Sequence, residues 1–278
     1  MLKLVVCIKQ VPLVSELPWD KKTGTLMREV AEGMMNPACL HALEAALCLK
    51  RDHGAVITAI TMGPPMAEEV LHEAMALGAD HGLLLTDRRM AGADTLITSQ
   101  TLAHAIGKEC PDFDLILCGC YTSDSETAQV GPQLAEALDI PGVAYIEDLA
   151  YSDGLLRMKR VSDDFLETLE MDLPGLVTVT TGAYAPRYLT MAGLEAAFNR
   201  ADITVHDAES LGLAAACLGM GASPTRILDV YSPTTGKDNL VLKGPPKRII
   251  EELLDRFEDR IIGAMGKDLK THDHGEGS

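Results

Sequence analysis

Short apolar runs alternate with amphipathic segments along the first half of the chain. The runs are typical of buried strands, which we expect at residues 2–8, 55–61, 82–86 and 115–118. After each run, apolar residues recur every three or four positions, which predicts helices at residues 37–52, 66–77, 95–109 and 128–138. This alternation indicates an α/β fold, in which helices cover both faces of a parallel sheet.

A polar segment separates the fourth predicted strand from the helix that follows it. Gly119 ends the apolar run, and mainly Ser, Thr, Asp and Glu follow until the helical pattern begins near Ala128. Ligands of parallel sheets bind beyond the carboxyl ends of the strands, where a helix N-terminus presents unpaired N–H groups to anions. The segment 119–130 is therefore a candidate phosphate-binding turn. An ordinary capped helix without a ligand is the alternative, because the same residue types are common helix caps.

The pattern changes after Pro141. Residues 143–149, 155–161 and 165–171 alternate between apolar and polar positions, which predicts three antiparallel strands with a hairpin turn at 152–154. A further core strand follows at 176–181. The connection at 182–200 is long and irregular in pattern, and connections of this length usually carry function.

We expect three parts along the chain. Residues 1–210 form the α/β domain, which includes the hairpin at 143–172 and the connection at 182–200. Residues 211–265 form a C-terminal arm, and its amphipathic helix near 249–261 either docks on a partner or packs on its own domain. Residues 266–278 are polar and rich in Gly and His, which predicts a disordered tail.

Charge and composition exclude several classes of partner. The formal net charge of −17 argues against nucleic acid or an anionic membrane, and six Tyr, four Phe and one Trp provide few surfaces for base stacking. No apolar run approaches the ~20 residues of a transmembrane helix, so we expect no membrane insertion. The seven cysteines lack the spacing of a structural zinc site, so we expect no bound metal. Their odd number, in a chain without a recognisable signal peptide, indicates a reducing cytoplasm.

A set of short segments in a fixed order resembles the β subunit of electron-transfer flavoproteins. They are VVCIKQVP at 5–12, MNPAC at 35–39, ALEAALCLK at 42–50, ITMGPP at 60–65, ALGAD at 76–80, GADT at 92–95, DLILCG at 114–119, TAQVGP at 127–132 and PRY at 186–188. The ordered set covers residues 2 to about 262 and is specific. ITMGPP, GADT and TAQVGP resemble the electron-bifurcating members most.

The resemblance implies a Rossmann-like domain of the adenine nucleotide α-hydrolase type, which works as a heterodimer with an FAD-carrying α subunit. In bifurcating members, the β subunit binds a second FAD that takes a hydride from NADH. One electron then passes to ferredoxin or flavodoxin, and the other passes through the α-subunit FAD to an acyl-CoA dehydrogenase. In the remaining members the β site holds AMP and the protein is a plain electron carrier. This is the alternative function for this chain.

The resemblance also implies which residues contact the cofactor. The matching positions are Cys7, Asn36, Pro37, Ala38, Cys39, Met62, Gly63, Thr95, Thr98, Gly119, Cys120, Tyr121, Thr122, Ser123, Asp124, Ser125, Thr127, Ala128, Gln129 and Val130. Asn36 and Asp124 suit sugar or adenine groups, and Thr95 and Thr98 match positions near the isoalloxazine. A helix cap is the alternative role of Asn36, and core packing is that of Cys7 and Met62.

Two departures from the family pattern bear on ligand and partner. The family usually has a basic residue and then Gln after Gly119, whereas this chain has Cys120 and Tyr121. The segment after PRY is usually rich in Lys, whereas residues 191–200 contain none. Met191 matches the apolar anchor that enters a partner protein.

Two further classes of function are alternatives. An ATP-pyrophosphatase would need a Ser-Gly-Gly turn after the first strand, and Cys7-Ile-Lys-Gln10 lacks it. A nucleotide-sensing module without redox activity is the other class. We expect no catalytic acid or nucleophile under the leading interpretation, because the flavin carries the chemistry.

Overall fold

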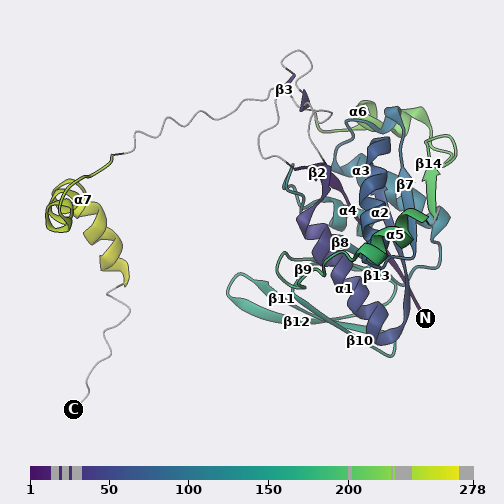
Figure 1. Ribbon diagram of the computed structural model, residues 1–278, viewed down its shortest axis with the longest axis horizontal. Helices are drawn as coiled ribbons and strands as arrows, with labels where there is room; N and C mark the ends of the chain where they lie inside the picture. The colour runs from purple at the N-terminus through teal and green to yellow at the C-terminus, as the bar shows by residue number, and fades with distance from the viewer. Residues whose placement is uncertain are drawn as a thin grey trace. The chain divides into compact units, whose positions relative to one another are not determined.

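The computed structural model describes residues 1–13, 19–20, 25–26, 33–199, 202–226, 228 and 240–268. The chain divides into two units, Met1–Asp229 and Val230–Ser278. A seven-stranded parallel sheet forms the centre of the first unit, in the order β14-β7-β6-β1-β8-β13-β9 (Figure 1). Its strands are β1 (Leu2–Cys7), β6 (Ala55–Met62), β7 (His81–Leu85), β8 (Leu115–Gly119), β9 (Gly142–Ile146), β13 (Gly175–Val179) and β14 (Ile203–His206).

Helices cover both faces of the sheet, which confirms the predicted fold class. α1 (Pro37–His53) and α2 (Glu68–Leu77) pack on one face, and α3 (Thr95–Glu109) and α4 (Val130–Ala137) pack on the other. Strand β1 shows why its sequence is a continuous apolar run. Leu4 and Val6 belong to the core beneath α1 and α2, whereas Val5 belongs to the core beneath α3 and α4.

The order of the strands reverses between β1 and β8. From β1 the chain passes outward to β6 and β7, and it then returns to place β8 on the other side of β1. The connections after β1 and β8 therefore leave the sheet on opposite faces. Open α/β sheets bind their ligands in the crevice between two such connections, at the carboxyl edge. The candidate turn 119–130 begins at this edge.

The strand predicted at 143–149 is wrong in both extent and direction. Residues Gly142–Ile146 form β9, which runs parallel to β13 at the edge of the main sheet. Tyr145 has a φ of 60°, and the register with β13 shifts between Val177 and Val179, so the chain turns out of the sheet there. The antiparallel sheet contains instead β10 (Asp148–Ser152), β11 (Leu155–Ser162) and β12 (Phe165–Asp172).

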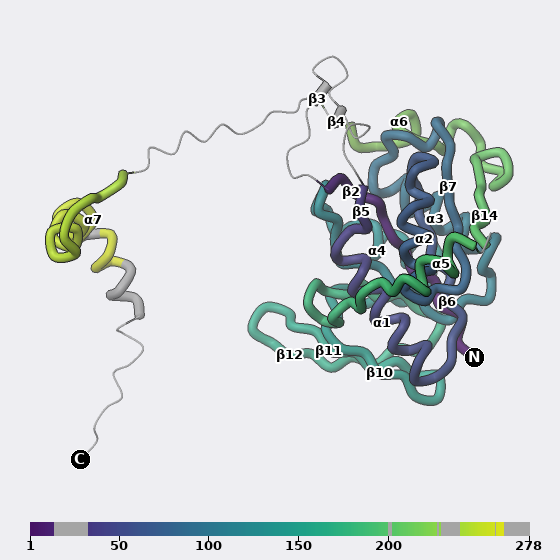
Figure 2. The backbone as a smooth tube through the Cα atoms, viewed as in Figure 1, coloured from purple at the N-terminus to yellow at the C-terminus, as the bar shows by residue number. Residues whose placement is uncertain are grey.

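Helix α5 (Met191–Asn199) and strand β14 are described elements that were not predicted. The connection 182–200 contains helix α5, which packs along α2 (Figure 2). Strand β14 extends the sheet beside β7. The shorter elements are β2 (Gln10–Pro12), β3 (Trp19–Asp20), β4 (Thr25–Leu26), β5 (Gly33–Met35), η2 (Pro65–Ala67), η3 (Arg88–Met90), η4 (Ala215–Cys217) and α6 (Gly219–Ala222).

The second unit contains the predicted amphipathic helix, α7 (Pro246–Asp268). Ile250, Leu253, Leu254 and Ile262 are exposed on it. The helix continues through the first residues of the segment expected to be a disordered tail, and residues 269–278 lie outside the described residues. None of the described helices combines the length and apolar character needed to cross a membrane.

Candidate functional site

The carboxyl ends of β1 and β8 lie side by side at the crevice. Cys7 and Cys118 are register partners on these two strands, and Gly119 ends β8. A Cβ atom on Gly119 would lie 2.6 Å from the carbonyl carbon of Ala38 and 2.8 Å from the backbone nitrogen of Cys39. The first turn of α1 therefore packs directly against the end of β8, which brings residues 36–39 beside the candidate turn.

Asn36 ties the start of α1 to the turn. Its Nδ2 donates to the carbonyl oxygen of Tyr121 at 2.9 Å, and its Oδ1 accepts from the backbone N–H of Ser123 at 3.0 Å. Among the described residues, its side chain makes no capping hydrogen bond to α1. Asn36 therefore occupies the cap position, as the Asn-Pro sequence predicts, but its side chain bonds to the turn and not to the N–H groups of α1. The buried amide fixes the backbone of the turn.

Lys9 and Asp124 form an ion pair across the same crevice. The Nζ of Lys9 lies 2.7 Å from Oδ1 and 2.9 Å from Oδ2 of Asp124. Only 6% of the Asp124 side chain is exposed. Lys9 belongs to the segment 5–12 that resembles the family, but it is not among the predicted cofactor-binding residues. A Lys that directly follows a buried strand, with Asp in the predicted turn, is the signal that could have identified it.

The turn adopts a conformation that L-amino acids rarely adopt. Glu126 and Ala128 have φ values of 50° and 56°, in the left-handed region. The N–H groups of Ser125 and Glu126 donate to the carbonyl oxygen of Thr122, at 3.3 and 2.8 Å. Thr122 Oγ1 and Ser125 Oγ lie 2.8 Å apart. Backbone strain of this kind persists where the surroundings hold it, and it concentrates at ligand sites.

Helix α3 reaches the turn from its N-terminus. Thr95 is its first residue, and its hydroxyl donates to Oε1 of Gln129 at 2.9 Å. Thr98 lies one turn further along, where it is half-buried. The sequence segments 92–95 and 127–132 thus meet in space, as the interpretation of a shared site requires.

The sulfur-containing candidates are mainly packing residues in this structure. Cys7 and Met62 are half-buried against the core beneath α3 and α4. Burial raises the pKa of the Cys39 thiol to about 11, and burial also raises the pKa of Cys120. These thiols are protonated at neutral pH. Gly63 follows β6, and its N–H donates to the carbonyl oxygen of Leu85 at 3.0 Å.

A separate hollow of about 260 Å³ lies at the other end of α1. Its lining includes Cys48, Asp52, Leu149, Tyr151 and Tyr184. The turn 119–130 packs at the start of α1 and the hollow lies at its end, so the two do not form one site.

The segment before α5 is fastened to α1 by Arg187. Its Nε and Nη2 donate to Glu44 at 2.9 and 2.8 Å, and its backbone N–H donates to Glu44 at 3.2 Å. Burial by itself raises the pKa of Glu44, but the hydrogen bonds from Arg187 outweigh it and lower the pKa below 4.5. Beyond this anchor, Tyr188 is 95% exposed and Met191 is 80% exposed.

We expect Glu44→Gln to lower the free energy of unfolding by about 1–2 kcal/mol at pH 7, because it breaks a charge-assisted pair. The folded-state pKa lies below the unfolded one, so the contribution is present above about pH 4.5 and is lost as pH falls through the folded pKa. Tm measured from pH 7 to pH 3 should therefore show the two proteins converging. Glu170→Gln, in an exposed pair with Arg157, is the control and should change Tm little. A Tm difference that does not vary with pH would contradict the prediction.

Residues 23–211 match the family described as "Electron transfer flavoprotein domain". A curated relative covers still more of the chain. The caffeyl-CoA reductase-Etf complex subunit CarD of Acetobacterium woodii is 41% identical over 263 residues, which are 94% of this chain and 100% of that protein. The chain belongs to the electron transfer flavoprotein family. It is an electron-transfer subunit of the β type, and the resemblance found in the sequence is confirmed.

Two other relatives of this electron transfer flavoprotein subunit match over similar lengths. The electron transfer flavoprotein subunit beta of Clostridium acetobutylicum is 40% identical over 258 residues, or 93% of this chain and 98% of that protein. The acryloyl-CoA reductase electron transfer subunit gamma of Anaerotignum propionicum is 37% identical over 267 residues, or 94% and 100%. By their names, two of these relatives are subunits that serve an acyl-CoA reductase, one for caffeyl-CoA and one for acryloyl-CoA.

Proposed function

We propose that this chain is the β subunit of an electron-bifurcating electron-transfer flavoprotein, and that it binds FAD at the carboxyl ends of β1 and β8. The observation that carries the proposal is the meeting of the turn 119–130 with Thr95 through Gln129. Both segments belong to the set that resembles bifurcating members. Relatives named for caffeyl-CoA and acryloyl-CoA reductases support a partner that acts on an acyl-CoA.

The residues at the crevice fit an adenine dinucleotide in their chemistry. The first turn of α4 begins at Val130, and the leading N–H groups of a helix lack intrahelical partners, so they suit phosphate oxygens. The hydroxyls of Thr122, Ser125 and Thr127 add donors. Lys9 places an ammonium group at the turn, although Asp124 already pairs with it. The family usually has a basic residue after Gly119, and Lys9 thus supplies a positive charge at the turn in its absence.

The chemistry supplied by a flavin bound here is hydride acceptance from NADH, with one electron delivered to ferredoxin or flavodoxin and one to the α-subunit FAD. The residues of this chain position the flavin and stabilise negative charge on it. Thr95 and Thr98 lie in the first turn of α3, where the positive end of the helix dipole favours negative charge. Asn36 and the Lys9–Asp124 pair hold the turn in the shape that receives the nucleotide.

A carrier with AMP in the same site is the second candidate, and one contact favours it. The hydroxyl of Thr95 is already bound to Gln129, which occupies the donor that a flavin ring would use. AMP needs only the sugar and phosphate part of the crevice. Under this candidate the subunit carries electrons between the α-subunit FAD and a dehydrogenase without reacting with NADH.

Cofactor analysis of the purified heterodimer tests the proposal. We expect two FAD per heterodimer and rapid bleaching of flavin absorbance by NADH. Thr95→Val should abolish that bleaching while the α-subunit FAD is retained, because the substitution removes only the hydroxyl. Thr101→Val is the matched control on the same helix, since Thr101 Oγ1 bonds to the carbonyl oxygen of Ile97 within α3. One FAD plus one AMP, with no reaction with NADH, would replace the proposal with the AMP carrier.

A further inference from the structure

The segment that follows β14 is bonded to the starts of two helical elements. Asp94 is the N-cap residue of α3, and its Oδ1 accepts from the backbone N–H of Ile97 at 3.0 Å. Its Oδ2 accepts from the backbone N–H of Thr225, also at 3.0 Å. The backbone N–H of Asp94 donates to Ser223 Oγ at 2.9 Å. One carboxylate thus caps α3 and at the same time holds a segment 131 residues further along the chain.

A close backbone contact supports this connection. Gly219 has a φ of +57°, and a Cβ atom on it would lie 2.2 Å from the carbonyl oxygen of Arg89 and 2.9 Å from that of Ala91. The buried Ser223 donates from Oγ to the carbonyl oxygen of Gly219 at 2.8 Å. Residues 219–225 therefore pack tightly on the loop that leads into α3.

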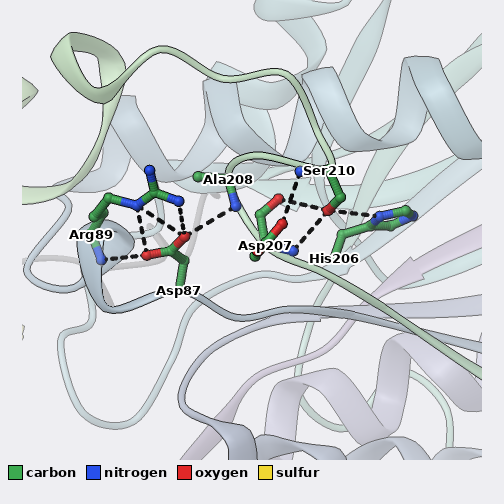
Figure 3. Close-up of polar contacts among 6 residues, drawn as sticks. All are labelled: Asp87, Arg89, His206, Asp207, Ala208 and Ser210. Carbon is green, nitrogen blue, oxygen red and sulfur yellow. Dashed lines mark hydrogen bonds and ion pairs between the residues drawn. The ribbon is translucent and has the colours of Figure 1, made fainter.

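Asp87 likewise caps a helical element, η3, and accepts a hydrogen bond from the segment after β14 (Figure 3). Its Oδ1 caps η3 by accepting from the N–H of Arg89 at 2.8 Å, and its Oδ2 accepts from the N–H of Ala208 at 3.2 Å. The side chain of Asp207 faces Ser210 within its own turn, and Oδ1 accepts from the Ser210 N–H at 2.8 Å. The segment after β14 is thus fixed at two helix starts, of which only that of α3 reaches the candidate site.

The connection continues from Asp94 to the candidate turn in two steps. Thr95 follows Asp94 directly, and its hydroxyl bonds to Gln129 at 2.9 Å. Gln129 lies between Ala128, with its left-handed backbone, and the first residue of α4. In the other direction, Thr225 lies four residues before Asp229, the last residue of the first unit.

We propose that Asp94 is a positioning residue that couples the C-terminal unit to the nucleotide site. The proposal rests on the proposed function, in which the turn 119–130 binds an adenine nucleotide. It also takes the first of the two roles expected for the C-terminal helix, docking on a partner, with the α subunit as that partner. Binding of the partner displaces the chain after Thr225. The displacement acts on the Asp94 carboxylate, which also caps the helix that begins at Thr95. Nucleotide binding and α-subunit binding then strengthen each other by one common factor, as reciprocal linkage requires.

Asp94→Asn tests the coupling without removing the helix cap. Asn is as good an N-cap as Asp, and its Oδ1 still accepts from Ile97, but its amide nitrogen cannot accept from Thr225. The dissociation constant of AMP is measured on the full chain alone and in the heterodimer. AMP is the probe because FAD contains the same moiety. We expect the α subunit to tighten AMP binding by at least about fivefold in the wild type, and by a factor near one in Asp94→Asn.

Asp207→Asn is the matched control, because among the described residues its carboxylate bonds to Ser210 in its own turn. It should keep the wild-type coupling factor. Ser223→Ala removes the acceptor of the Asp94 N–H and should lower the factor partway. A Tm of Asp94→Asn close to the wild-type value establishes that the variant is folded.

The outcomes separate this proposal from the proposed function. If the α subunit tightens AMP binding equally in the wild type and in Asp94→Asn, the coupling through Asp94 is overturned and the proposed function stands. A wild-type factor of one does the same. A wild-type chain that binds neither AMP nor FAD overturns the proposed function, and the coupling fails with it.

Discussion

Gly119→Ala is expected to lower the free energy of unfolding by about 3 kcal/mol and to abolish nucleotide binding. The added Cβ would lie 2.6 Å and 2.8 Å from backbone atoms of Ala38 and Cys39. Backbone atoms at the buried start of α1 cannot move aside as a flexible side chain can, so α1 and β8 must separate. Chemical denaturation of the full chain gives the stability, and AMP titration gives the binding.

The control is Gly107→Ala, on the exposed side of α3. Apart from its chain neighbours and the backbone of its own helix, no described heavy atom lies within 4 Å of a Cβ at this position. Ala is the better helix former there, and we expect a gain of about 0.5–1 kcal/mol. Equal effects of the two substitutions would show that the contact between Gly119 and α1 is not tight in solution.

Met191→Glu is expected to slow electron transfer to the proposed partner, an enzyme that acts on an acyl-CoA, by about a hundredfold or more. If Met191 enters an apolar pocket of the partner, the substitution buries an unpaired carboxylate, which costs several kcal/mol. In the free chain the side chain is 80% exposed, so Tm should change little. Stopped-flow kinetics with the heterodimer and its partner measure the effect.

Met191→Leu keeps the volume and apolar character of the side chain and should transfer electrons at nearly the wild-type rate. Flavin content and reaction with NADH should be the same in all three proteins, because Met191 is not one of the predicted cofactor-binding residues. Unchanged transfer in Met191→Glu would remove the start of α5 from the partner interface.

The parallel sheet was predictable because its central strands are buried on both faces and its helices begin and end at Pro, Asp and Gly. β9 and β14 were not, since both are short edge strands. Residues 143–149 were expected to pair with the antiparallel strands that follow them. The true direction of Gly142–Ile146 depends on pairing with Gly175–Val179, which lies beyond the whole antiparallel sheet in the sequence. Pattern alone does not report a pairing across that separation.

The position of the candidate site followed from topology, but the partners of its side chains did not. Asn36 before Pro37 has the sequence of a helix cap, yet its amide bonds to Tyr121 and Ser123, 85 and 87 residues away. Glu44 is a further example. It lies on the buried stripe of α1, and a charged residue there signals a distant partner, but the sequence does not single out Arg187.

Helix α1 also fixes the distance between two attachment points. Asn36 at its start holds the turn 119–130, and Glu44, eight residues later, holds the segment that presents Tyr188 and Met191. At 1.5 Å per residue these two attachment points are about 12 Å apart along one rigid axis. Electron tunnelling slows steeply as the distance between donor and acceptor grows. A helix that carries both attachments therefore fixes the distance between the turn 119–130 and the segment that presents Met191. If a partner docks at Met191, as we predict, it meets the crevice at a spacing that side-chain motion in the connection 182–200 cannot alter.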